Sequence, residues 1–64
     1  LMTRLKVGDR VYVTCEDGGE LKGTVRKVMK VNAIVDVIVN DGGEIDYGAT
    51  IGMDFLKPVK WGVN

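Results

Sequence analysis

The fold is decided by residues 33–47, which read AIVDVIVNDGGEIDY. In residues 33–39 the apolar side chains that we expect inside the protein are Ala33, Val35, Val37 and Val39. A period of two is that of a β-strand with one buried face, and this strand should be central in its sheet. The polar, glycine-containing run 40–43 then predicts a hairpin that returns the chain as a second strand.

The register of this hairpin follows from keeping apolar side chains on one face. A three-residue loop, Asp41 to Gly43, pairs Val39 with Ile45 and Val37 with Tyr47. A two-residue loop would instead place a carboxylate in the core. One of the two glycines of the loop should supply the positive φ that a bulged three-residue hairpin requires.

Two further strands should precede the hairpin. Residues 9–14 alternate in the same way and follow a turn at Gly8 and Asp9. A second strand begins at Leu21 and ends before a turn at residues 30–32. Its apolar positions slip out of period two, which predicts a bulge near Arg26 and Lys27.

After Tyr47 the pattern weakens. Residues 48–54 suggest an irregular link, with residues 53–55 forming one helical or 3-10 turn. Residues 56–59 form the last short strand, and Pro58, which lacks an N–H donor, favours an edge position for it.

Length and composition limit the remaining possibilities. A chain of 64 residues can bury one core, so we expect a single domain over residues 1–64, with flexible ends at 1–6 and 60–64. Nearly every Val, Ile, Leu and Met should be buried, together with two of the four aromatic residues. The single cysteine and the absence of histidine exclude a disulfide within the chain and a typical zinc site. No apolar run is long enough for a membrane span, so we expect a soluble, cytoplasmic protein.

Three segments resemble the SH3-like small barrels. They are residues 7–13, VGDRVYV, residues 23–28, GTVRKV, and residues 55–59, FLKPV. The first two are similar to KOW and Tudor-type domains, and the overall layout is similar to the PsaE subunit of photosystem I. The resemblance implies an all-β fold, a five-stranded SH3-like partly open barrel with one short 3-10 turn before the last strand.

Catalysis is not expected. The chain has no histidine for proton transfer, and Cys15 has no imidazole to activate it, so Cys15 should be a small core or strand-end residue. The aromatic run of peptide-binding SH3 domains is missing, and four aromatic residues, with two in the core, are too few for a methyl-lysine cage. We therefore expect no enzyme, no cofactor, no metal and no small-molecule substrate.

The leading hypothesis is an interaction module that binds a protein partner or forms a homo-oligomer. If alternate residues of 33–39 are buried, Ile34 and Ile38 face outward, where exposed branched side chains suggest a contact surface. Asp36 lies between the two isoleucines and Asp46 lies on the next strand. The acidic hairpin that contains them could accept a basic partner. Loops that cover both faces of the strand would be the alternative explanation for the two isoleucines.

The second hypothesis is a nucleic-acid-binding barrel. A basic stretch with no intervening acid contains Lys22, Arg26, Lys27 and Lys30. Tyr12 could stack on a base, and Lys57, Lys60 and Trp61 could extend the surface. Against this, nine basic and nine acidic side chains cancel, and a charged strand face can serve only to discourage edge pairing.

Overall fold

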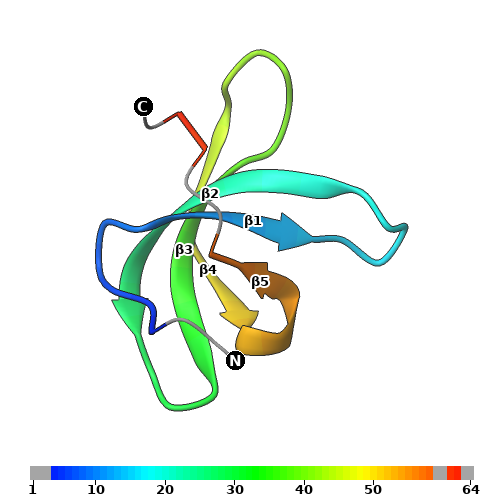
Figure 1. The fold of residues 1–64 in the computed structure, drawn as a ribbon. Helices are drawn as coiled ribbons and strands as arrows, with labels where there is room; N and C mark the ends of the chain where they lie inside the picture. The colour runs from blue at the N-terminus through cyan, green and yellow to red at the C-terminus, as the bar shows by residue number, and fades with distance from the viewer. Residues whose placement is uncertain (1–3, 59–60, 63–64) are drawn as a thin grey trace.

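A computed structural model describes residues 4–58 and 61–62 and contains one antiparallel sheet (Figure 1). Its elements are β1 (Arg10–Thr14), β2 (Glu20–Val28), β3 (Asn32–Ile38), β4 (Ile45–Gly52), the 3-10 turn η1 (Met53–Phe55) and β5 (Leu56–Lys57). The strand order is β4-β3-β2-β1-β5, and in the described part of the chain no pairing joins β4 to β5. The predicted all-β class, with five strands and a 3-10 turn before the last, is confirmed. The open, curved sheet is compatible with an SH3-like fold.

The predicted bulge in β2 is confirmed. Val25 lies opposite Val35 and Lys27 lies opposite Ile34, so Arg26 is the extra residue on β2. A bulge of this kind increases the local twist and bends the strand. In Figure 1 the long strand β2 curves across the whole molecule, and this curvature brings β1 and β5 over the inner side of β3 and β4.

The core lies on this concave inner side and is small. Its buried members are Leu5, Val11, Val13, Val25, Ala33, Val35, Val37 and Leu56. Gly23 of β2 leaves space for Val35 on the neighbouring strand β3, because a Cβ atom there would lie 2.6 Å from Cγ1 of Val35. The sheet therefore encloses a volume that valine side chains fill.

Two expectations about burial were wrong. No aromatic side chain belongs to the core of the described residues, and Tyr47 is 67% exposed. Several aliphatic side chains are also outside the core, including Val7 and Val31, each 69% exposed. The physical reason is the small enclosed volume, which eight aliphatic residues already occupy.

The predicted register of the β3–β4 hairpin was also wrong. The N–H of Val39 donates to the carbonyl of Glu44 at 2.8 Å, which closes a loop of the four residues 40–43. Ile38 therefore lies opposite Ile45, and Val37 lies opposite Asp46. Gly43, with φ +82°, supplies the positive φ that was expected from one of the two loop glycines.

A second bulge explains why the inner face of β4 differs from the prediction. Val35 pairs with Ala49 and Val37 with Asp46, so Tyr47 and Gly48 both stand opposite Asp36. Gly48 has φ +77°, a conformation that favours glycine. Beyond the bulge Ala49 and Ile51 pack against the core, and β4 continues to Gly52 where an irregular link was expected.

The two ends of the chain contribute to the structure where they are described. Leu5 is buried in the core, and Trp61 is half-buried against the sheet. Strand β5 lies at an edge of the sheet, as Pro58 predicted, and its expected continuation to Val59 falls outside the described residues. None of the helical structure in the described residues is long and apolar enough to cross a membrane.

Candidate interaction surface

The outer face of the sheet, meaning the side opposite the core, contains most of the predicted partner-binding residues. Ile34, Asp36 and Ile38 alternate with buried residues of β3 and are half-buried on this face. Asp46 does not share it, because its register position opposite Val37 places it on the inner side of the free β4 edge. The structure thus brings together three of the four residues.

The basic residues of β2 lie on the same outer face. Lys22 is opposite Ile38, and Lys27 is opposite Ile34. Tyr12 of β1 is opposite Lys22, so it lies beside this basic strand as predicted. The two predicted surfaces are therefore one surface, with its basic part on β2 and its apolar part on β3 and β4.

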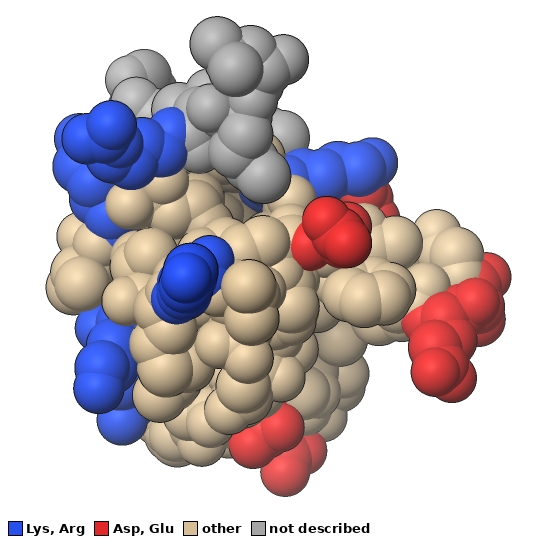
Figure 2. Space-filling view, turned by 90° about the horizontal axis from the view of Figure 1, so that it is seen from below, with Lys and Arg blue, Asp and Glu red and all other residues tan. Residues whose placement is uncertain are grey.

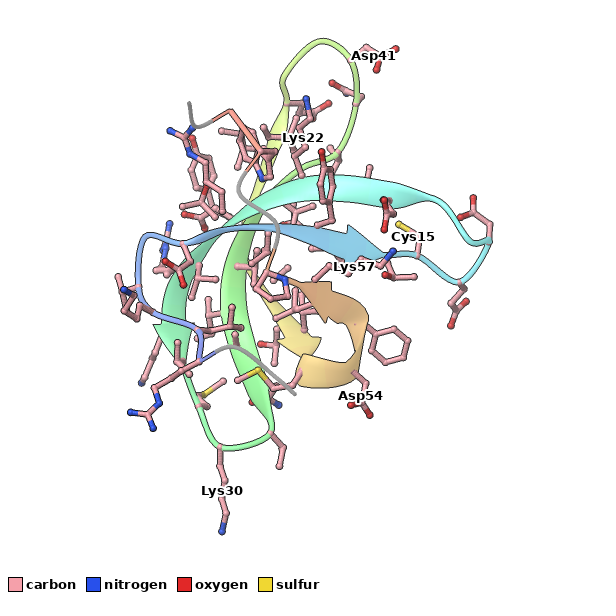
Figure 3. All side chains as sticks on the ribbon, in the orientation of Figure 1. Cys15, Lys22, Lys30, Asp41, Asp54 and Lys57 are labelled. Atoms are coloured by element: carbon pink, nitrogen blue, oxygen red, sulfur yellow. The ribbon has the colours of Figure 1, made fainter. Side chains whose placement is uncertain are left out.

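The basic stretch does not form a compact patch. Figure 3 places Lys22 near one end of the molecule and Lys30 in the turn at the opposite end. Lys30 is eight positions after Lys22 and lies beyond the end of β2 at Val28. A ligand that contacted both lysines would have to follow the whole length of β2.

Arg26 of this stretch is already paired with an acid of the same face. Its Nη2 atom lies 3.1 Å from Oδ1 of Asp36, and its guanidinium carbon lies 5.9 Å from the centre of the Tyr47 ring. Asp36 also accepts a hydrogen bond of 2.9 Å from the N–H of Gly48, which fixes it at the β4 bulge. The charge of Arg26 is thereby balanced within the protein.

Lys57 is balanced in a similar way, by Glu20 at 2.6 Å. Lys60 lies outside the described residues. In Figure 2 most of the blue Lys and Arg side chains lie on the left of the face in view, with one more at the upper right beside an acid. The red acidic side chains lie on the right, where the β1–β2 loop protrudes, and at the bottom. The zero net charge therefore hides an uneven distribution.

Trp61 lies on the outer face beside Lys22, next to the basic surface that the sequence suggested it could extend. Its indole N–H lies 2.9 Å from the carbonyl oxygen of Val11 and 3.1 Å from that of Gly23, so the ring lies over β1 and β2. The Arg10 guanidinium and the Lys22 ammonium lie 5.0 and 5.5 Å from the ring centre, within the range of cation–π contacts. Arg10 also donates a hydrogen bond of 2.7 Å to the carbonyl of Gly62.

Trp61 forms one wall of an open groove with a volume of about 440 Å³. Its apolar lining residues are Leu21, Ile38, Val39 and Trp61. Lys22 and Asp41 are among the charged residues that line it. The groove therefore joins the apolar part of the outer face to the acidic β3–β4 loop.

Other chemistry has little support among the described residues. No three His, Cys, Asp or Glu side chains of residues 4–58 and 61–62 are grouped so that they could hold a metal ion. Cys15 is a half-buried free thiol directly after the end of β1. The chain matches no family model, no curated protein and no solved structure.

Proposed function

We propose that this chain is a non-enzymatic, SH3-like interaction module that binds another protein chain, a second copy included, through the outer face of β3 and β4. The observation that carries the proposal is the apolar surface on this face. Ile38 lies opposite Ile45, which is 38% exposed, and the exposed Tyr47 ring follows at the bulge.

The energetics of a small domain support an interface at this position. An apolar side chain that stays outside a small core contributes no burial free energy to the stability of the isolated chain. Burial of such a side chain against a partner favours association by a free energy of about 25 cal/mol for each Å² of apolar surface removed from water. Contiguous exposed apolar residues on adjacent strands are typical of contact surfaces.

Light scattering over a range of protein concentrations tests the proposal. We expect a mass above the 7.0 kDa of one chain, and Ile38→Lys should return the protein to a monomer because it places a charge in the centre of the interface. Val31→Lys is the control, since Val31 is an exposed aliphatic residue that lies in the β2–β3 turn and not on this face. Circular dichroism of both variants establishes that the fold is kept.

Two results together would count against this function. One is a wild-type chain that stays monomeric at high concentration. The other is a photo-crosslinking amino acid at position 38 that captures no protein in a cell extract.

Nucleic-acid binding is the second candidate. The observation that favours it is the shared face of Lys22, Lys27 and Tyr12, which offers cations beside an aromatic ring. The ion pairs of Arg26 and Lys57 weaken it, because each acid cancels a charge that would otherwise meet a phosphate.

A further inference from the structure

The groove beside Trp61 lies where four parts of the chain meet. The start of β2 contributes Leu21, the end of β3 contributes Ile38, and the β3–β4 loop and Trp61 complete the walls. Lys22 lies over the Trp61 ring, and Figure 3 shows Asp41 at the tip of the β3–β4 loop. The groove thus has an apolar floor between two charged sides.

Its size and shape fit side chains of an extended peptide. A volume of about 440 Å³ is within the usual range of ligand sites, and the groove is partly open to solvent. An open apolar groove suits a chain that lies along it and inserts one or two side chains.

The walls of the groove are held in place before any partner arrives. The side-chain amide of Asn40 donates to Glu44 at 2.8 Å, and the N–H of Glu44 donates back to Asn40 at 3.2 Å. On the other side, the indole N–H of Trp61 is held by two backbone carbonyls. A preformed site loses less conformational entropy on binding.

The loop side of the groove carries negative charge. Asp41 lines the groove, and Glu44 is held beside it by the lining residue Asn40. Neither carboxylate has a Lys or Arg within 4.0 Å in the described part of the chain, whereas Glu20, the other acid of the lining, is paired with Lys57. Lys22, the one cation among the described lining residues, lies over the Trp61 ring on the other side. A partner side chain that approaches the loop therefore meets uncompensated carboxylates.

We propose that this groove binds an extended peptide segment of another protein in which apolar side chains alternate with Lys or Arg. The apolar side chains enter between Ile38 and Trp61, and the basic side chains meet Asp41 and Glu44. This inference rests on the proposed function, for which it names the chemistry of the partner.

Fluorescence of Trp61, the single tryptophan of the chain, reports on binding in the groove. The probes are three blocked hexapeptides without aromatic residues: Gly-Lys-Leu-Lys-Leu-Gly, its acidic counterpart with Glu for Lys, and its polar counterpart with Ser for Leu. We expect a saturable emission change with the first peptide. Binding of the other two should be weaker by about tenfold or more.

Charge reversal on the loop provides the matched variants. Asp41→Lys combined with Glu44→Lys should weaken the basic apolar peptide by about tenfold or more. Glu16→Lys combined with Asp54→Lys makes the same change of charge away from the groove and should leave binding nearly unchanged.

The inference is overturned if the three peptides behave alike, if none changes the emission at roughly 1 mM, or if both double variants weaken binding equally. Failure of this inference can be distinguished from failure of the proposed function. If Ile38→Lys abolishes self-association while no peptide binds, the interaction surface stands and the peptide site does not.

Discussion

At the scale of single residues, Gly23 leaves room in the core for the side chain of Val35. Its φ is not positive, so its role is steric and not conformational. A side chain at this position would meet Val35 inside the core and the backbone carbonyl of Asp36 at 3.3 Å. Neither neighbour can move without disturbing the central pairing of the sheet.

Gly23→Ala should therefore lower the free energy of unfolding by about 1–3 kcal/mol, because an added methyl group overpacks the core. Chemical denaturation of the purified protein measures this change. Gly52→Ala is the control, since a Cβ there would lie 3.5 Å from the Phe55 ring, an ordinary contact, at a φ of −65°. Equal stability of both variants would show that Val35 can move aside.

At the scale of elements, the bulge at Tyr47 and Gly48 controls which side chains of β4 face the core. It adds one residue opposite Asp36, so the alternation before the bulge is out of phase with the alternation after it. Tyr47 is consequently directed to Arg26 on the outer face, while Ala49 and Ile51 face the core. The interaction surface depends on this local irregularity.

Gly48→Ala should destabilise the protein by about 1 kcal/mol, because a residue with a Cβ atom is strained at a φ of +77°. Gly48→Asn should cost less, since asparagine tolerates the left-handed region. The nearest side-chain atom to an added Cβ is Ile34 Cγ2 at 3.9 Å, so steric overlap is not the cause. Denaturation midpoints of the two variants measure the difference, and a larger loss for Asn would contradict the explanation.

The two bulges show how much of the fold the sequence could predict. The β2 bulge was predictable because valines on both sides of Arg26 break period two. The β4 bulge was not predictable, because Gly48 has no side chain and Ala49 has only a methyl group, so neither residue indicates which face it occupies. The hairpin loop was therefore predicted one residue too short, and Tyr47 was placed inside.

The candidate site was predictable to a similar degree. Ile34, Asp36 and Ile38 belong to one regular strand, so their common face follows from the alternation alone. The indole of Trp61 donates hydrogen bonds to Val11 and Gly23, which lie 50 and 38 positions earlier in the chain. No local sequence pattern encodes contacts of such long range. The sequence suggested that Trp61 could extend the basic surface, but for this reason it did not predict the groove that Trp61 completes.

At the scale of the whole molecule, internal pairing limits the charge available to a polyanion. Two cations near the basic surface are held by Glu20 and Asp36. Glu20→Gln combined with Asp36→Asn releases Arg26 and Lys57 and keeps a hydrogen-bond acceptor for Gly48. This double variant tests how much the two ion pairs weaken binding to a polyanion.

We expect weak, salt-sensitive binding of the wild-type protein to oligouridine in a fluorescence titration. The double variant should bind more tightly, with a slope of log K against log salt that is steeper by roughly 1.4 for two added phosphate contacts. Glu16→Gln combined with Asp54→Asn removes the same charge from acids outside both ion pairs and serves as the control. Tight binding of the wild-type protein at physiological salt would instead favour the nucleic-acid function.

The pairing of β5 has a consequence for how the molecule opens. Neighbouring strands from β1 to β4 are adjacent in sequence, whereas β5 joins β1 through only two residue pairs, Tyr12 with Lys57 and Val13 with Leu56. Pairing β1 with β5 closes the long stretch of chain between them, and two residue pairs offset little of the entropy that this closure costs. We therefore expect release of β5 to cost little backbone pairing, although it also exposes the core residue Leu56. It leaves β1 as a second unpaired edge, in addition to β4, with which another chain can pair.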